Sequence, residues 1–468
     1  METLLQKAFS ADAFRTNGHK LIDLLADRLA NSQNTTQPFS LCWQEADNML
    51  EYWKQDAQKP LLEEPFELFS NILSHSINLY SKSTMGHQVP PPAPHAVLGT
   101  LLTAFLNNGS AVYEMGMTGN ALEKMIIAEM AKTFGLGDDV SGFITSGGTL
   151  GNLTALLCAR AVMQDAGDDD NSQLAALVSV EAHYSVERAM RVMGYDVENV
   201  IKVPVNEHFQ IRTDLLEEYY EKAVAAGKKV FCIIGCACST STGSYDDLEA
   251  LALFAKKHNL WFHVDGAHGA AAVYSPKYKH LLNGIEHADS IIVDFHKMMC
   301  VPSLSTAVIF RRPGDSYKTF AQKAQYLWAD QEKKEWQNSG KRTFECTKPM
   351  TVVSIYTLMR MYGNELFKEN VETLCALAAQ FAALVTAHPH FELAVQPQSN
   401  IVCFRYIAAG NLDDINKRIL QHLVREGKYY ITGTTLNNSF CLRTAIMNPL
   451  TGITEFEGLL EYIQQVPL

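Results

Sequence analysis

The sequence lacks several features that would each define a class of protein. Its ten cysteines include no Cys-x-x-Cys pair and no zinc-finger spacing. The densest group, Cys232, Cys236 and Cys238 in VFCIIGCAC, is interpreted as buried thiols of a strand rather than as a metal site. No G-x-G-x-x-G motif follows the early apolar runs, which disfavours a plain dinucleotide-binding protein. We therefore expect neither a disulfide framework nor a bound metal.

Long apolar runs and an excess of positive charge are also missing. No stretch reaches the roughly 20 apolar residues that a membrane span needs, and the N-terminal METLLQKAFSADAFRTNGHK lacks the apolar core of a signal peptide. Lys and Arg number 39 against 51 Asp and Glu, which leaves a net charge of −12. Because nucleic acids and anionic membranes select a basic face, neither is an expected partner. The scattered cysteines favour a reducing, cytoplasmic location.

Length and patterning indicate more than one folded part. The 468 residues exceed the roughly 250–300 residues at which single cores stop growing. Residues 1–85 have helical spacing, and a proline-rich elbow, VPPPAP, follows at 89–94. From about residue 365 helical stretches alternate with the strand-like IVCFRYI and FCLRTAIM. We predict an N-terminal helical segment (1–85), a large domain (86–364) and a small α+β domain (365–468).

The middle part has the pattern of a mostly parallel sheet covered by helices. Runs of strand length that are apolar on both faces recur as LAALVSVE, VFCIIGCAC, LWFHVD, SIIVDF and STAVIF. Between the second and third lies DDLEALALFAKKHN, an amphipathic helix for which Asp246 is the expected N-cap. Strands that alternate with helices in this way predict an α/β fold.

Side chains with chemical uses follow several of these strands. Asp265 ends LWFHVD, Lys297 follows SIIVDF, and His183 follows VSVE. A glycine-rich turn, ITSGGTLGN at 144–152, opens a helix. Taken singly, each has a plainer interpretation as a solvated charge, a helix cap, a structural histidine or an ordinary loop. Ligands of open α/β sheets bind at the carboxyl ends of the strands, so we expect these groups to meet at one edge.

One cofactor needs all four of these features together. Pyridoxal phosphate requires a lysine for its Schiff base and a carboxylate that keeps its ring nitrogen protonated. It also requires phosphate donors, which glycine-rich turns and helix N-termini supply, and a flat face stacked on its ring. In that order the roles are filled by Lys297, Asp265, the turn at 147–149 and His183.

The motifs resemble those of the group II pyridoxal-phosphate-dependent amino-acid decarboxylases, which include glutamate, cysteine sulfinate, aspartate, diaminobutyrate and aromatic amino-acid decarboxylases. The resemblance rests on TSGGTLGNLTAL, SVEAHYSVERA, HVDGAHGA and ADSIIVDFHKMM, within about residues 75–360. It implies an aspartate-aminotransferase-like fold (fold type I) with a seven-stranded, mostly parallel sheet. It also implies a homodimer with the active site at the subunit interface and the N-terminal helices wrapped around the partner.

The resemblance also implies roles for individual residues. Lys297, His183 and Asp265 would be the catalytic residues, as Schiff-base lysine, ring-stacking histidine and partner of the pyridine nitrogen. Asp294 stands where many relatives have asparagine, and we expect it to orient His296 or a backbone amide. The residues expected to bind the cofactor are Gly147, Gly148, Thr149, His183, Thr240, Asp265, Ala267, Asp294, His296 and Lys297.

Three residues are expected at the substrate. Arg443, in FCLRTAIMNP, stands where acid-specific members place an arginine for the α-carboxylate. Gln88 and His87, in STMGHQVPPP, are candidates near the substrate side chain, although Gln88 could equally bond the loop backbone. An acidic substrate such as aspartate or glutamate is slightly favoured. A diamino acid, with Glu114 as its partner, comes next, and aromatic amino acids are less favoured.

The implied reaction is decarboxylation of an L-amino acid to the amine and carbon dioxide through a quinonoid intermediate. Family members usually carry a tyrosine on a mobile loop that protonates this intermediate. The corresponding stretch, DQEKKEWQNSGKRTFECTK, contains Trp336 and Gln337 but no tyrosine. Either His183, Tyr326 or a water supplies the proton, or oxygen intercepts the intermediate and an aldehyde forms. A cofactor-free binding protein with the same fold is a third hypothesis, which the retained Lys297 and Asp265 argue against.

Overall fold

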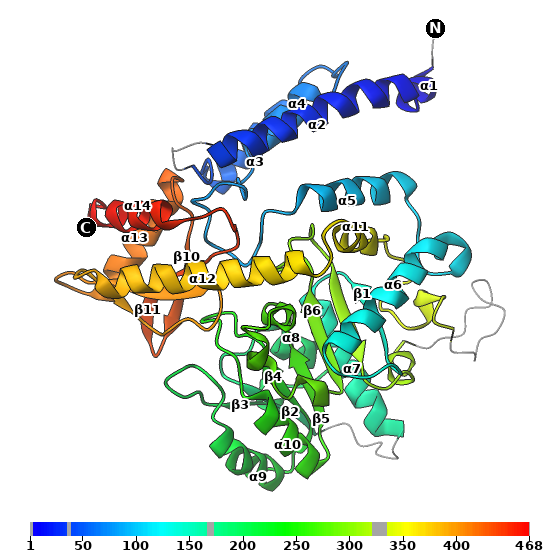
Figure 1. Cartoon of the computed structure of the whole chain (residues 1–468), viewed down its shortest axis with the longest axis vertical. Helices are drawn as coiled ribbons and strands as arrows, with labels where there is room; N and C mark the ends of the chain where they lie inside the picture. The colour runs from blue at the N-terminus through cyan, green and yellow to red at the C-terminus, as the bar shows by residue number, and fades with distance from the viewer. Residues whose placement is uncertain (1–2, 35–38, 166–172, 321–334, 468) are drawn as a thin grey trace. The chain divides into compact units, whose positions relative to one another are not determined.

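The computed structural model describes residues 3–34, 39–165, 173–320 and 335–467 (Figure 1). The chain divides into two compact units. The first comprises residues 1–87, 379–394 and 402–468, and the second comprises residues 88–378 and 395–401. The three predicted parts, with boundaries at 85 and 364, remain a prediction.

The second unit is built on a seven-stranded sheet with the order β1-β7-β6-β5-β4-β2-β3. Neighbours from β6 to β3 pair in parallel, and β7 pairs antiparallel with both β1 and β6. A mostly parallel seven-stranded sheet is therefore confirmed. The strands are β1 (Ser141–Thr145), β2 (Leu174–Ser179), β3 (Val200–Val203), β4 (Lys229–Cys236), β5 (Trp261–Asp265), β6 (Ser290–Asp294) and β7 (Thr306–Phe310).

Five of these strands coincide with the apolar runs of the sequence, namely β2, β4, β5, β6 and β7. Every residue of β2, β5, β6 and β7 is buried, so helices cover both faces of the sheet. Two strands gave no clear signal in the sequence. β1 is SGFIT and β3 is VIKV, and both are short and carry polar residues.

Several helices pack against the strands of this sheet. α7 contacts β4, β5, β6 and β7, while α9 and α10 both contact β4. α11 packs on α5 and α6, and α6 also contacts β1. The helices of this unit are α5 (Pro94–Leu106), α6 (Tyr113–Thr133), α7 (Gly148–Asp165), α8 (Ser185–Val192), α9 (Leu216–Ala225), α10 (Leu248–His258) and α11 (Val352–Tyr362).

The expected N-cap of α10 is wrong by one residue. Asp247 caps the helix, because its side chain accepts a hydrogen bond from the amide of Ala250 at 3.0 Å. Asp246 instead accepts from the amides of Ile211 and Cys236, both at 2.8 Å, and so ties two segments together. Burial raises the pKa of Asp246 to about 6.

The first unit combines the N-terminal helices with a small sheet of order β10-β11-β9-β8. The strand-like IVCFRYI and FCLRTAIM are confirmed as β9 and β11. The amide of Met85 donates to Tyr430 O, and the amide of Ala445 donates to Met85 O, both at 2.8 Å. The elements are α1 (Leu4–Ala8), α2 (Ala11–Asn34), α3 (Ala46–Asp56), α4 (Phe66–Ser74), β8 (Phe391–Leu393), β9 (Ile401–Tyr406), α13 (Leu412–Glu426), β10 (Thr432–Leu436), β11 (Ser439–Ala445) and α14 (Ile453–Gln464).

One helix corrects the expectation that no stretch is long and apolar enough to span a membrane. Among the described residues, α12 (Glu365–Ala387) meets that test by length and composition, with a mean hydropathy of 1.3. About 44% of its most apolar window is buried. Phe367, Val371, Leu374 and Phe381 are each at most 1% exposed. Packing of this face in the core accounts for the apolar composition of the helix.

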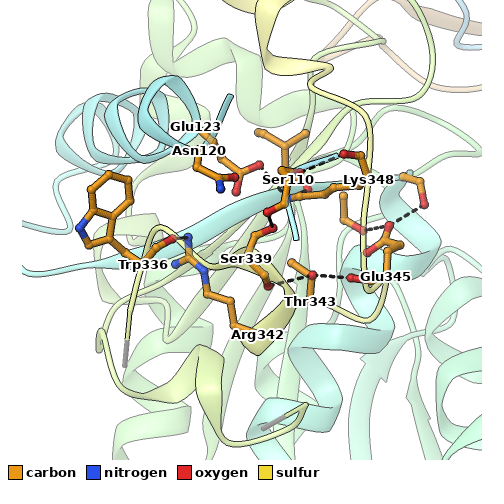
Figure 2. Close-up of polar contacts among 12 residues, drawn as sticks. Ser110, Asn120, Glu123, Trp336, Ser339, Arg342, Thr343, Glu345 and Lys348 are labelled. Atoms are coloured by element: carbon orange, nitrogen blue, oxygen red, sulfur yellow. Dashed lines mark hydrogen bonds and ion pairs between the residues drawn. The ribbon is translucent and has the colours of Figure 1, made fainter. Parts of the chain in front are cut away.

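Within the second unit, a buried ion pair anchors the stretch at 335–348 to α6 and β1 (Figure 2). Lys348 Nζ lies 2.7 Å from Glu123 Oε2 on α6 and also donates to the carbonyl of Ile144 in β1. The two charged side chains are 8% and 6% exposed. Burial lowers the pKa of Lys348, although Glu123 acts in the opposite direction. Because both side chains are shielded from water, each charge is stabilised mainly by the other.

Substituting one partner of this pair should destabilise the fold strongly. We expect Lys348→Met to lower the free energy of unfolding of the second unit by roughly 3–5 kcal/mol, because Glu123 would stay buried without its counter-charge. The double variant Glu123→Leu/Lys348→Met should recover most of that loss. Urea unfolding followed by tryptophan fluorescence measures both. A Lys348→Met variant as stable as the parent would show that the Glu123–Lys348 pair does not stabilise the fold.

Candidate active site

A cavity of about 310 Å³ lies at the carboxyl ends of the central strands of the second unit. Asp265 and Asp294 are the last residues of β5 and β6, and Lys297 follows β6 by three positions. All ten residues that the sequence predicts for the cofactor line this one cavity. The structure thus brings together groups that were selected only by their chemistry and their place after a strand or turn.

The glycine-rich turn forms one wall of the cavity. Gly147 has a φ of +105°, which side-chain-bearing residues rarely adopt, and α7 begins at Gly148. A Cβ atom at position 148 would lie 3.3 Å from both Ala267 Cβ and Asp294 Oδ2. The missing side chain therefore lets the start of α7 lie close to Ala267 and Asp294. Unpaired amides at a helix N-terminus bind anions such as phosphate.

A carboxylate outside the cavity holds the residues that precede this turn. Thr145 Oγ1 and Ser146 Oγ both donate to Glu345 Oε1 at 2.9 Å. Ser146 lines the cavity, whereas Glu345 belongs to the anchored stretch at 335–348. Figure 2 shows Glu345 beside Thr343 and on the same side of the cluster as Lys348. The stretch and the turn are thereby connected through hydrogen bonds.

Lys297 lies next to a buried acid. Its Nζ atom is 3.1 Å from Asp294 Oδ2, and its side chain is 22% exposed. Burial acts to lower the pKa of Lys297, but the carboxylates of Asp294 and Asp265 outweigh it and the pKa is raised. Asp294 also accepts from Thr306 Oγ1 at 2.5 Å and lies 3.6 Å from His296 Nε2. Asp294 thus lies closer to the lysine than to His296, and its expected role in orienting His296 or a backbone amide remains a prediction.

Asp265 and His183 are held by two residues that the sequence did not single out. Asp265 Oδ2 accepts from Asn152 Nδ2 at 2.8 Å, and Oδ1 accepts from the amide of Ala267 at 3.2 Å. His183 Nδ1 lies 2.7 Å from Ser185 Oγ. Asn152 follows Gly148 by four positions, and that spacing places its side chain one helical turn above the glycine turn. This periodicity was the available signal for Asn152.

The cysteine cluster is buried as the sequence indicated. Cys232, Cys236 and Cys238 are each at most 7% exposed, and Cys236 and Cys238 line the cavity. Burial raises the pKa of Cys238 to about 12, so its thiol stays protonated at neutral pH. Within the described residues, no group of His, Cys, Asp and Glu is arranged to hold a metal ion.

The three residues expected at the substrate are not among those that line the cavity. Arg443, on β11 of the first unit, is 5% exposed and donates to Thr432 Oγ1 at 3.2 Å and Gly86 O at 3.3 Å. Burial, together with the charge of Arg443, lowers the pKa of His87 in the same unit. Gln88 belongs to the second unit, and its Nε2 atom is buried without a hydrogen-bond partner in the described part of the chain.

The stretch without a tyrosine is only partly described. Tyr326 lies outside the described residues. Trp336 is 39% exposed, and neither Trp336 nor Gln337 lines the cavity. The carbonyl oxygen of Trp336 accepts a hydrogen bond from Arg342 Nη2 at 3.3 Å (Figure 2). The carbonyl oxygen of Gln337 accepts one from Asn120 Nδ2 at 2.5 Å. The segment is therefore attached through its main chain.

This set of groups fits pyridoxal phosphate. Lys297 supplies a primary amine, Asp265 supplies a buried carboxylate for a protonated ring nitrogen, and the start of α7 supplies phosphate donors. The turn at 147–149 lines the same cavity as these groups.

Comparison with known proteins gives the same result. Residues 55–407 match the family model described as the pyridoxal-dependent decarboxylase conserved domain. An aromatic-L-amino-acid decarboxylase from Bacillus atrophaeus is 27% identical over 80% of this chain and 79% of its own. An L-2,4-diaminobutyrate decarboxylase from Acinetobacter baumannii is 26% identical over 86% and 82%. An L-aspartate decarboxylase from Metarhizium robertsii is 27% identical over 74% and 70%.

Solved structures establish the fold. The crystal structure of 4-hydroxyphenylacetaldehyde synthase from Rhodiola rosea superposes with a TM-score of 0.86, covers 98% of both chains and shares 19% of its residues. The likeness confirms the aspartate-aminotransferase-like, fold type I class predicted from the sequence.

Removing the negative charge beside Lys297 should make its amine easier to deprotonate. Asp294→Asn should lower the pKa of Lys297, because burial would then act with less opposition. The uncharged amine is the form that condenses with an aldehyde, so uptake of pyridoxal phosphate at neutral pH should be roughly tenfold faster. Stopped-flow absorbance between pH 6 and 10 measures this. Thr306→Val is the control, since it keeps the charge, and an unchanged pH profile in Asp294→Asn would contradict the expectation.

Proposed function

The chain belongs to the pyridoxal-dependent decarboxylase family, and from that premise we propose that it decarboxylates an acidic L-amino acid, such as aspartate or glutamate, to the amine. It is a pyridoxal-phosphate-dependent carboxy-lyase, as its family is. The observation that carries the proposal is the single cavity that joins Lys297, Asp265, His183 and the turn at 147–149.

Each residue of the cavity has a distinct task in this proposal. When bound, the cofactor supplies an electron sink for the bond between Cα and the carboxylate. Lys297 would provide the amine that holds it, and Asp265 would stabilise a proton on its ring nitrogen. The amides at the start of α7 would hold its phosphate, while His183 and Ala267 would contact its ring. Asp265 and Asp294 are 8% and 2% exposed, and burial of this kind strengthens charge interactions.

Gln88 supports an acidic substrate, whereas Arg443 suits the α-carboxylate that every amino acid has. Arg443 keeps its charge at any physiological pH, and Gly86 O and Thr432 Oγ1 hold its guanidinium in place. Gln88 Nε2 is a buried donor with no partner in the described residues. A buried donor of this kind calls for an acceptor, and a side-chain carboxylate oxygen would supply one. We therefore propose that Arg443 and Gln88, with His87 nearby in sequence, recognise the substrate.

Other amino acids remain as ranked alternatives. A diamino acid comes second, and relatives that share a quarter of the sequence include both a diaminobutyrate and an aromatic amino-acid decarboxylase. The relatives therefore span more than one class of substrate.

A second outcome, oxidative decarboxylation and deamination to an aldehyde, is favoured by one observation. The stretch at 330–348 contains no tyrosine, and its described part holds Trp336 and Gln337 away from the cavity lining. A neutral indole or amide cannot donate a proton as a phenol does. One structure with the same fold is that of 4-hydroxyphenylacetaldehyde synthase from Rhodiola rosea.

The proposal includes a homodimer. None of α1, α3 and α4 has a buried residue, and α2 has only Ser32, so these helices lack a core of their own. α5 exposes a stripe of apolar side chains at helical spacing, formed by Leu98, Leu101, Leu102 and Phe105. A second copy of the chain would cover such surfaces.

All ten cysteines are free, which supports a reducing, cytoplasmic setting.

A product assay separates the two outcomes. Holoenzyme is offered a panel of L-amino acids, and carbon dioxide, amine, aldehyde and oxygen uptake are measured together. We expect one mole of amine per mole of carbon dioxide, without oxygen uptake, and the highest rate with an acidic amino acid. Aldehyde with matching oxygen uptake would instead establish the oxidative outcome. No carbon dioxide from any member of the panel would overturn both.

Lys297→Ala should abolish turnover while the fold stays intact. The variant lacks the amine that holds the cofactor, so borohydride treatment should leave no added cofactor mass on the chain, as read by mass spectrometry. Circular dichroism should match the parent. Lys277→Ala, at a lysine outside the cavity, is the control and should retain both the added mass and the activity. Near-parental turnover by Lys297→Ala would show that the site is assigned wrongly.

A further inference from the structure

A continuous chain of hydrogen bonds connects Asp265 with His183, and Asn152 on α7 is its branch point. Asn152 Nδ2 lies 2.8 Å from Asp265 Oδ2 and 2.8 Å from Ser185 Oγ. Asn152 Oδ1 lies 2.9 Å from His263 Nε2. Ser185 Oγ lies 2.7 Å from His183 Nδ1. The amide thus meets three neighbours and is itself 1% exposed.

The chemistry of these neighbours sets the orientation of the amide. An ionised carboxylate only accepts, so the NH₂ group of Asn152 must face Asp265 and its carbonyl must face His263. His263 then carries its proton on Nε2 and donates it to Asn152 Oδ1. Burial lowers the pKa of His263 to about 4, so its ring is neutral at physiological pH. A neutral ring with a proton on Nε2 must accept at Nδ1.

A donor for that atom is in place. His263 Nδ1 lies 2.8 Å from Ser290 Oγ, and Trp261 Nε1 donates to the same oxygen at 2.8 Å. The indole can only donate, so the hydroxyl of Ser290 can donate to His263. The carbonyl oxygen of Ser290 also lies 3.2 Å from His263 Nδ1 and can only accept, so it favours the other tautomer of His263. The orientation of the Asn152 amide is therefore set by the carboxylate of Asp265.

The second branch leads to His183. The other amide hydrogen of Asn152 is donated to Ser185 Oγ, which leaves the hydroxyl hydrogen of Ser185 for His183 Nδ1. The backbone amide of Ser185 points at the same Nδ1 atom at 3.3 Å, and an amide only donates. His183 Nδ1 thus accepts two hydrogen bonds, one from the hydroxyl and one from the backbone amide of Ser185.

We propose that Asn152 is a positioning residue that aims the Asp265 carboxylate and, through Ser185, keeps His183 in the tautomer whose proton is on Nε2. This inference rests on the cofactor site proposed above. It extends that site by naming a residue of the cavity wall that determines which atom of His183 can donate.

The tautomer restricts what His183 can do in the reaction. Burial lowers the pKa of His183, so its ring is neutral. A neutral ring with a proton only on Nε2 can donate a hydrogen bond from that atom. Giving the proton away would leave an anionic ring, which is costly in a buried site. His183 therefore serves as a hydrogen-bond donor, and the proton that completes the amine product comes from another group.

The test uses one variant for each branch. Asn152→Leu has a similar volume and removes both branches, whereas Ser185→Ala removes only the branch to His183. The first readout is the tautomer of His183 in cofactor-free protein, from ¹⁵N NMR of histidine-labelled chain with His183→Gln to assign the signal. We expect a protonated Nε2 and an unprotonated Nδ1 in the parent, and a mixture of tautomers in both variants. A proton on Nδ1 in the parent would overturn the proposal.

The second readout is the dissociation constant of pyridoxal phosphate, from titration of cofactor-free protein. Losing a hydrogen bond to the charged Asp265 should weaken binding roughly ten- to a hundredfold in Asn152→Leu. Ser185→Ala should stay within about threefold of the parent, because its Asp265 branch is intact. Equal affinities for Asn152→Leu and the parent would overturn the aiming of Asp265. Neither readout involves a substrate, so a failed product assay and a failed positioning role give different results.

Discussion

Burial of the central sheet on both faces is the constraint on which the rest of this molecule depends. A strand that is covered on both sides carries mostly apolar side chains along its length, so charged groups appear where the strand ends. In β5 and β6 those end positions hold Asp265 and Asp294. Parallel pairing then brings the ends of neighbouring strands to one edge, and a cavity rich in charge forms beside an apolar core.

Within that cavity two acids and one lysine set the electrostatic balance. Asp294 lies close enough to Lys297 to keep its amine charged against the effect of burial. Asp265 accepts a hydrogen bond from the side-chain amide of Asn152. One acid is thus paired with the lysine, and the other is stabilised by hydrogen bonds from neutral donors. A buried site balanced in this way responds strongly to the loss of a single charge.

The sequence predicted the residues that follow strands and turns, and it failed where a side chain acts from inside an element. All ten cofactor residues meet at the cavity because each lies at a strand end or in the glycine turn. Asn152 and His263 were missed, since one lies within a helix and the other within an apolar run. Asp246 was misplaced by one residue, because two adjacent acids both suit a helix start and only tertiary contacts separate them. The placement of Arg443 could not come from periodicity, because it depends on how distant segments pack.

The attachment of residues 336 and 337 has a consequence for how this enzyme can change over evolutionary time. Arg342 and Asn120 bind the carbonyl oxygens of Trp336 and Gln337, and every residue type presents the same carbonyl. Substitutions at these two positions therefore leave the anchoring hydrogen bonds unaltered. The path of the backbone past Asn120 and Arg342 can thus persist in a lineage while the side chains at 336 and 337 change.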